Sequence, residues 1–187
     1  MNIDPIVLIE RHYPPGTLSH RVMLAHGREV AELAAAVAAR VARHSTVDLD
    51  FVVEAAWLHD IGIGLTATPR LGCQGKAPYI AHGILGADLL RQAGLPRHAL
   101  VSERHIGVGL TVGDIDRQRL PLPRRDMSPQ ALEEEIIAYA DLFFSKQTDG
   151  PGGPRTAAEV RAKLGRFGDG KIAIFDRWHA RFAPELS

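Results

Sequence analysis

Histidine and aspartate residues fall on the apolar stripes of several predicted helices, where a globular chain usually places hydrophobic side chains. His26, for example, lies four residues from both Val22 and Val30, so the three share one helix face. The other residues at such positions are His59, Asp60, His82, His105 and Asp141. Burying one such group without a partner costs on the order of 1–3 kcal/mol, and an unpaired carboxylate costs more. A divalent cation would offset that cost, because imidazole and carboxylate are ordinary ligands of transition metals.

Each of these residues also has a simpler explanation when it is taken alone. A single inward-facing histidine is more often a hydrogen-bonded core residue than a metal ligand, and a buried aspartate can accept hydrogen bonds from hydroxyls or a helix end. The joint pattern favours a metal, because independent core residues need not converge. The remaining histidines lie at predicted helix ends or among charged residues and are expected to be solvated: His12, His20, His44, His98 and His179.

Helical periodicity dominates the chain, and the pattern predicts an all-α fold, a single-domain helical bundle. The expected helices cover about residues 21–43, 49–60, 81–93, 97–108, 128–147 and 156–164, with a last one from Gly170 to about Phe182. Gly94 is expected to end the third of these helices, and the Thr156–Glu159 pair has the spacing of a capping box.

A Pro- and Gly-rich stretch at residues 149–154 predicts a linker or an exposed turn. We therefore expect a main domain over residues 1–148 and a helical extension over residues 149–187 packed on the same domain. The hydrophobic residues of that extension leave three roles open: packing on the core, covering the site, or mediating a homodimer.

The overall composition excludes several classes of protein. The 187 residues carry 22 basic and 22 acidic side chains, so the net charge of zero gives no general attraction to nucleic acid or to an acidic membrane. The single cysteine, Cys73, excludes an intrachain disulfide and is typical of a reducing compartment. Neither a signal peptide nor an apolar run of the roughly 20 residues that a membrane span needs is found. A cytoplasmic protein without nucleic-acid or membrane partners is expected.

Three motifs resemble one known family. The run Ala-Ala-Trp-Leu-His59-Asp60-Ile61-Gly62 resembles the motif that names the HD superfamily of metal-dependent phosphohydrolases, in its HDIG form. The helix around His26 is similar to the first-histidine helix of that superfamily, and Ala-Tyr-Ala-Asp141 resembles its last ligand motif. The resemblance covers roughly residues 18–147, and the stretch from Glu103 to Asp141 is similar to a small uncharacterised subfamily. It implies a helical bundle of the HD-domain type around a metal site.

The resemblance also implies roles for individual residues. His26, His59, Asp60 and Asp141 would hold a first divalent metal, and Asp60 would bridge to a second one bound by His82 and His105. Asp60, His82 and His105 are therefore the expected catalytic residues. The cofactor would be one or two ions of Fe, Mn, Ni, Zn or Co. The Gly-Tyr-Pro motif of the cyclic-dinucleotide phosphodiesterases is missing, which argues against a cyclic-dinucleotide substrate.

The predicted activity is hydrolysis of a phosphoester or phosphoanhydride in a small, nucleotide-like substrate by a metal-activated hydroxide. Basic residues near the expected ligands are candidates for binding the substrate phosphate: Lys76, Arg104, Arg124 and Arg125, with Lys146 a weaker candidate. Each of them is as easily an ordinary surface charge. Two alternatives stay open: a di-iron oxygenase with the same ligands, and a regulatory module whose metal only holds a nucleotide or stabilises the bundle.

Overall fold

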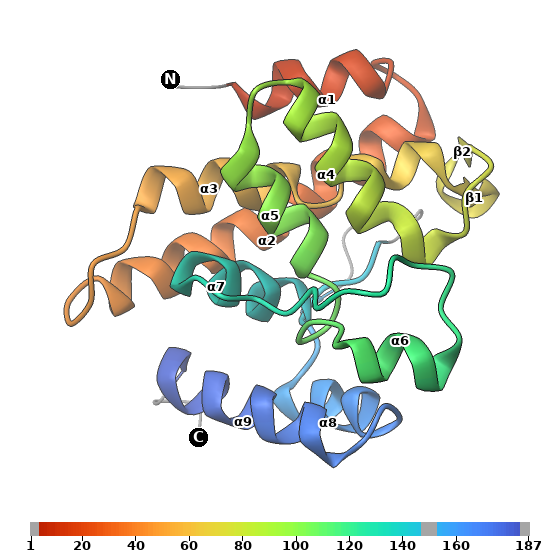
Figure 1. Cartoon of the computed structure of the whole chain (residues 1–187). Coiled ribbons are helices and arrows are strands. Elements are labelled where there is room, and N and C mark those ends of the chain that lie inside the picture. Colours follow the sequence, from red (N-terminus) through yellow and green to blue (C-terminus); the bar gives the residue numbers. More distant parts are fainter. Residues whose placement is uncertain (1–3, 147–152, 184–187) are drawn as a thin grey trace.

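The computed structural model describes residues 4–146 and 153–183 and shows a mostly helical single domain (Figure 1). The all-α prediction is confirmed. The longer helices are α1 (Pro5–His12), α2 (Leu18–Val41), α3 (Leu49–Leu58), α4 (His82–Gln92), α5 (Pro96–Arg104), α6 (Val112–Gln118), α7 (Leu132–Asp141), α8 (Ala157–Gly165) and α9 (Asp169–Phe182). Among the helices of these ranges, none combines the length and the hydropathy that a membrane span requires.

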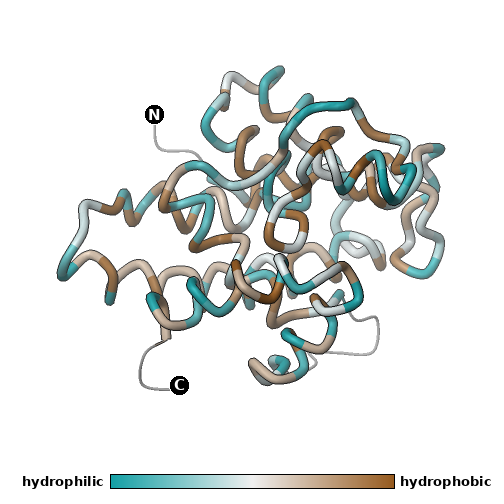
Figure 2. The backbone as a smooth tube through the Cα atoms, turned by 60° about the horizontal axis from the view of Figure 1, so that its bottom comes forward, coloured by the Kyte–Doolittle hydropathy of each residue, from teal (hydrophilic) through white to brown (hydrophobic). Residues whose placement is uncertain are grey.

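The main core forms where α2, α3 and α7 pack together. Buried Val30, Val37, Val52 and Ile137 belong to one hydrophobic cluster, to which α9 adds Phe175 and Phe182. Figure 2 shows hydrophobic stretches where the helices meet and hydrophilic ones at the outer turns. Because His26, His59 and Asp141 lie on or next to these same three helices, the packing that builds the core also brings the polar residues together.

Between α3 and α4 the chain folds into short elements. These are η1 (Ile61–Leu65), β1 (Ala67–Thr68), η2 (Pro69–Leu71), β2 (Cys73–Gln74) and η3 (Tyr79–Ala81), and the two strands pair antiparallel. Glycines let η1, α4 and α5 approach closely: a Cβ added at Gly62 would lie 2.2 Å from the carbonyl oxygen of His82, and one at Gly83 would lie 2.7 Å from that of Ser102. These glycines of the HDIG motif and of α4 are therefore needed to set the distances between the helices that carry the polar residues.

The helices α8 and α9 lie beside α7, on the side of the molecule away from α1 and α4 (Figure 1). Val160, Leu164 and Trp178 join the main hydrophobic cluster. A capping box joins Thr156 and Glu159, as the spacing predicts. The expected boundary between residues 148 and 149 lies outside the described residues, as does most of the expected linker. The division into two parts thus stays a prediction.

Several local expectations were wrong. Helix α1 was not predicted, although Asp4 caps it and Pro5 occupies its first turn, a usual helix start. The helix expected at 97–108 ends at Arg104, because the chain turns through positive φ angles at Gly107 and Gly109. The helix expected to begin at Ser128 begins at Leu132, because Met127 pairs with Leu110 in an extended bridge.

Two of the histidines expected to be solvated are buried. His20 is 9% exposed and lies 3.6 Å from Glu10, and His98 is 8% exposed, 3.3 Å from Glu54. Both expectations failed because side chains of other helices, Glu10 of α1 and Glu54 of α3, lie against these rings. His12 and His44 are exposed, and His179 is partly buried against the hydroxyl of Tyr139.

Candidate metal centre

Four polar side chains meet where α2, the end of α3 and the end of α7 converge. Nε2 of His26 lies 3.1 Å from Oδ2 of Asp60 and 3.0 Å from Oδ1 of Asp141. Nε2 of His59 lies 3.1 Å and 3.5 Å from the same two oxygens. The ligand atoms of all four residues lie within 4.8 Å of one another, close enough for one metal ion.

A second cluster shares Asp60 with the first. Oδ1 of Asp60 lies 3.2 Å from Nε2 of His82 and 3.4 Å from Nε2 of His105, which come from the start of α4 and the end of α5. The two oxygens of Asp60 thus face two different pairs of histidines. If each cluster held a metal ion, Asp60 would be a ligand of both ions.

The backbone fixes which nitrogen of three histidines faces the site. The Nδ1 atoms of His59, His82 and His105 each lie 2.6–2.8 Å from the carbonyl oxygen three residues earlier. A carbonyl only accepts, so Nδ1 carries the proton, and each ring in its neutral form presents the Nε2 lone pair to the site. A backbone partner of this kind is usual for metal-bound histidine.

The same geometry leaves buried polar atoms unsatisfied. Nε2 of His26 and of His59 and Oδ1 of Asp60 are buried without a hydrogen-bond partner in the structure. Nε2 of His82 and Nε2 of His105 lie only 3.1 Å apart, with two lone pairs facing each other when both rings are neutral. A cation removes both penalties, since all these atoms are donors to a metal. The residues present therefore fit one or two divalent ions.

Lys146 supplies a buried positive charge beside these ligands. Its Nζ lies 2.6 Å from Oδ2 of Asp60, and the lysine side chain is only 9% exposed. Burial lowers the pKa of Lys146, but Asp60 and Asp141 outweigh it, so the pKa is raised and the amine stays charged. Burial raises the pKa of Asp60, but the charges of Lys146 and His59 hold it well below its usual range. Burial likewise lowers the pKa of His59, and the two carboxylates outweigh this effect and raise it to about 10.

Residues outside the clusters fix the turn that carries His59 and Asp60. The Tyr13 hydroxyl donates to the carbonyl of Ile61 (2.8 Å) and accepts from the N–H of Gly64 (2.6 Å). The Ser102 hydroxyl donates to the carbonyl of His59 (2.7 Å). The sequence analysis missed both residues, because such hydrogen bonds join segments that are distant in the chain.

The basic residues predicted to bind phosphate lie apart from this centre or are already paired. Lys76 is exposed. Arg104 donates to Glu134, Arg124 to Asp116 and Arg125 to Glu103. None of the four lines the cavity next to the metal centre. Lys146, the weaker candidate, does line it.

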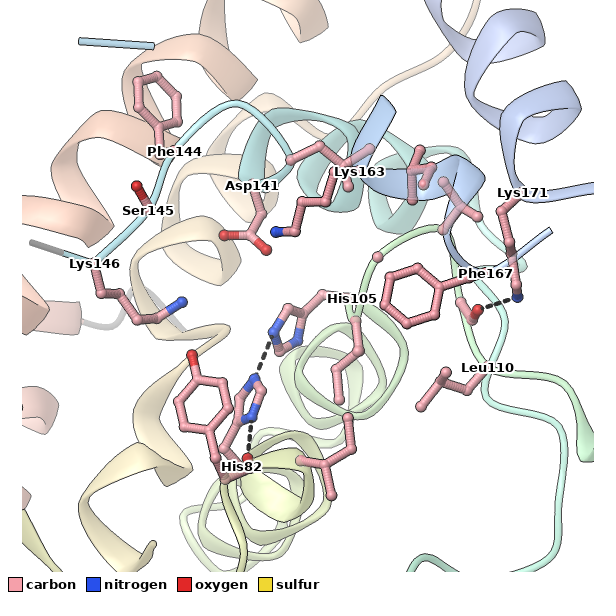
Figure 3. Close-up of a pocket in the computed structure, with 18 of the residues that line it drawn as sticks. His82, His105, Leu110, Asp141, Phe144, Ser145, Lys146, Lys163, Phe167 and Lys171 are labelled. Atoms are coloured by element: carbon pink, nitrogen blue, oxygen red, sulfur yellow. Dashed lines mark hydrogen bonds between the residues drawn. The ribbon is translucent and has the colours of Figure 1, made fainter. Parts of the chain in front are cut away.

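The metal centre opens into a cavity of about 450 Å³, a size typical of small-molecule sites (Figure 3). His82, His105, Asp141 and Lys146 border one part of it, and the side chain of Asp141 is 17% exposed whereas that of Asp60 is 1% exposed. Apolar residues of the loops after α5 and α6 and of α8 line much of the rest: Ile106, Val108, Leu110, Leu120 and Leu164. A ligand in this cavity would reach the metal centre through its Asp141 side.

Sequence and structure comparisons agree with this geometry. The chain is 35% identical to a tRNA (cytidine(56)-2′-O)-methyltransferase of Thermoplasma volcanium over 124 residues, which cover 66% of this chain and 32% of the relative. It is 37% identical over 106 residues to an uncharacterised protein of Methanocaldococcus jannaschii, covering 55% of each. The chain thus spans about a third to a half of these curated relatives. Its fold matches the HD domain of the phosphodiesterase PgpH of L. monocytogenes, with a TM-score of 0.56, 20% identity and coverage of 99% and 98% of the two chains.

A profile of the HD domain matches residues 23–144, which include all of the candidate ligands. The predicted resemblance is confirmed. The match spans well over half of the chain. It begins within α2 and ends just after α7. The chain belongs to the HD domain family.

Proposed function

We propose that this protein is a metal-dependent hydrolase that cleaves a phosphoester or phosphoanhydride bond of a small, nucleotide-like molecule. The observation that carries the proposal is the position of Asp60, whose two oxygens face two sets of histidines, together with a cavity of small-molecule size that His82 and His105 line. A purely structural metal site has no need of such a cavity, because structural sites are closed by protein ligands.

The two clusters would divide the ligands between two ions. His26, His59, Asp60 and Asp141 would hold one ion, and Asp60, His82 and His105 the other. When bound, divalent ions at such a site lower the pKa of water and neutralise charge on phosphoryl oxygens. Three of the histidines are held in the required tautomer by backbone carbonyls, so little reorganisation is needed when they bind a cation.

Lys146 would contribute to substrate binding. Its ammonium lies at the wall that the cavity shares with the metal centre and stays charged (Figure 3). A cation in that place attracts a phosphate group and balances the carboxylates of Asp60 and Asp141. We place this role on Lys146 in preference to Arg104, Arg124 or Arg125, because Lys146 lines the cavity and these three arginines do not.

The comparisons support the family and the fold on which this proposal rests. The structural neighbour is the HD domain of a phosphodiesterase, and at 20% identity it supports the fold. The matched part of the methyltransferase relatives is about a third of their length, so their methyl-transfer activity is not carried over to this chain.

The test uses the full chain loaded with manganese and assayed for phosphate release from an aryl phosphate and from a panel of nucleotides. Metal analysis should find about one or two equivalents. Asp60→Asn keeps the size of the side chain but removes the bridging charge. It should lower both the metal content and the rate, the latter by about a thousandfold, which corresponds to about 4 kcal/mol of transition-state stabilisation.

Asp88→Asn is the matched control, because Asp88 lies on α4 with a side chain 58% exposed and pairs only with Arg91. It should leave the metal content and the rate unchanged. Activity that survives Asp60→Asn would show that the reaction occurs elsewhere. Oxygen uptake by an iron-loaded sample, without phosphate release, would show that the protein is an oxygenase and not a hydrolase.

A further inference from the structure

The extension that follows α7 supplies part of the wall of the cavity. Lys163 and Leu164 of α8, Phe167 in the turn before α9, and Lys171 of α9 all line it. These residues lie outside the segment 23–144 that matches the HD domain family. Contacts of a ligand with these four residues would therefore be made only in HD-domain proteins that carry this extension.

The extension is held in place by Arg155 and by Lys171, one of these lining residues. Nη1 of Arg155 donates to the carbonyls of Leu142 (3.0 Å) and Phe144 (2.6 Å). Nζ of Lys171 donates to the carbonyl of Gly109 (2.7 Å) and lies 2.5 Å from the buried carboxylate of Asp114. The charges of Arg155 and Lys171 are thus used to fix the extension against α6 and the end of α7.

Lys163 differs from these two residues. Within residues 4–146 and 153–183 its side chain forms no ion pair or hydrogen bond, although that of Arg161 on the same helix pairs with Asp176 at 3.1 Å. Figure 3 shows its ammonium directed into the cavity beside Asp141. An unpaired cation next to a metal ligand is well placed to contact an anionic group of a substrate.

Phe167 stands four residues after Lys163 and is 45% exposed although it lines the cavity. In Figure 3 its ring lies at the opposite end of the cavity from Lys146, near Leu110. One end of the cavity is therefore charged and adjoins the metal centre, and the other end carries an open aromatic face beside the ammonium of Lys171, which is already bound to Gly109 and Asp114. Such a face is suited to stacking against a planar ring.

We infer that Lys163 and Phe167 determine substrate specificity: Lys163 binds the phosphoryl group and Phe167 stacks on the planar aromatic body of the same molecule. The ligand class is a nucleoside phosphate, or another phosphorylated compound with a flat aromatic group one sugar away from the phosphate. This inference rests on the proposed function for the position of the phosphate group. It adds that the ligand also carries a planar aromatic group, which lies against Phe167.

Binding measurements with ligands that cannot be cleaved test this inference separately from the proposed hydrolysis. The probes are the 5′-phosphonates of adenosine, guanosine, cytidine and uridine, together with ribose 5-phosphonate, in which a methylene replaces the ester oxygen and prevents cleavage. Dissociation constants are measured by calorimetry on the full, manganese-loaded protein. At least one nucleoside phosphonate should bind about tenfold more tightly than ribose phosphonate, because stacking of one base contributes about 1–3 kcal/mol.

Variants of Lys163 and Phe167 test the role of each residue in binding. Phe167→Ala and Phe167→Leu should weaken the nucleoside phosphonate about tenfold and leave ribose phosphonate unchanged, and Phe167→Trp should restore binding. Lys163→Gln should weaken both ligands by a similar factor. Two controls should change neither affinity: Arg161→Gln, on the same helix but paired with Asp176, and Val7→Ala, an exposed residue of α1 that does not line the cavity.

Equal affinity for nucleoside and ribose phosphonates, or a Phe167→Ala variant that binds both normally, would overturn the inference. The expected binding pattern in a protein that hydrolyses no phosphoester would support the inference and refute the proposed hydrolysis. Hydrolysis without this pattern would refute the inference and leave the metal chemistry intact.

Discussion

The ammonium of Lys146 lies 2.6 Å from Oδ2 of Asp60, so the most deeply buried carboxylate of the metal centre is in contact with a buried cation of the chain itself. Lys146 lies in the extended segment after α7, five residues beyond Asp141. Two carboxylates and one ammonium thus lie together in a region shielded from water. The lysine and a bound divalent ion both neutralise the same negative charge.

Replacing Lys146 by Met should destabilise the metal-free protein by about 3–5 kcal/mol, because one partner of a buried ion pair is left without the other. Manganese should restore more stability to this variant than to the wild type. Unfolding in urea, with a chelator and with manganese, measures both effects. Lys76→Met, at an exposed lysine without an ion pair among the described residues, should match the wild type under both conditions. Equal stability of all three metal-free proteins would contradict the role given to Lys146.

Gly62 of the HDIG motif should not tolerate a side chain. A Cβ there would lie 2.2 Å from the carbonyl oxygen of His82 and 2.3 Å from the nitrogen of Gly86, so η1 and α4 would have to separate. Gly62→Ala should cost about 3 kcal/mol, and it should lower metal content by displacing His82. Gly170→Ala in α9, where the added Cβ meets nothing within 4 Å, should be neutral or stabilising by up to about 1 kcal/mol. Urea unfolding and metal analysis of the two variants compare these effects, and equal losses would contradict the packing argument.

Tyr13→Phe should weaken the turn that carries His59 and Asp60, although Tyr13 precedes the segment matched to the HD domain family. The substitution leaves the N–H of Gly64 and the carbonyl of Ile61 without their hydrogen bonds to the tyrosine hydroxyl. The expected loss is about 1–3 kcal/mol of unfolding free energy. Val7→Ala, on the helix that ends just before Tyr13 and 48% exposed, is the control and should be close to neutral. A Tyr13→Phe variant as stable as this control would show that the hydroxyl is dispensable.

Asp114 should make the stability of the extension depend on pH. Burial raises the pKa of this carboxyl, but hydrogen bonds from Lys171 and Thr111 outweigh burial and hold the pKa below its usual range. A depressed folded-state pKa contributes stability that is present above the unfolded value of about 3.9 and is lost as the pH falls through the folded value.

Asp114→Asn should therefore cost about 2 kcal/mol at pH 7, and the difference from the wild type should shrink below about pH 4. Urea unfolding of both proteins over this pH range gives the difference directly. A difference that stays constant down to pH 2 would show that the charge of Asp114 contributes nothing.

The sequence by itself determined which residues could form the metal centre. Helical periodicity placed His26 and Asp141 on buried faces, and the motif around His59 and Asp60 marked the turn between them. These signals are local, since a helix face is defined by residues three and four apart. The burial of six polar side chains is costly unless they share a partner, which is why their convergence could be expected from the pattern alone.

Only the tertiary structure decided how charge is arranged around that centre. The sequence placed Arg104 and Arg125 near the ligands, but Glu134 and Glu103 take up their charges from other parts of the chain. Lys146 and Lys163 reach the cavity from an extended segment and from a helix that packs on the far side of α7. An ion pair or a cavity wall depends on which surfaces meet in space, and neither helical periodicity nor a short motif specifies contacts between segments so distant in the chain.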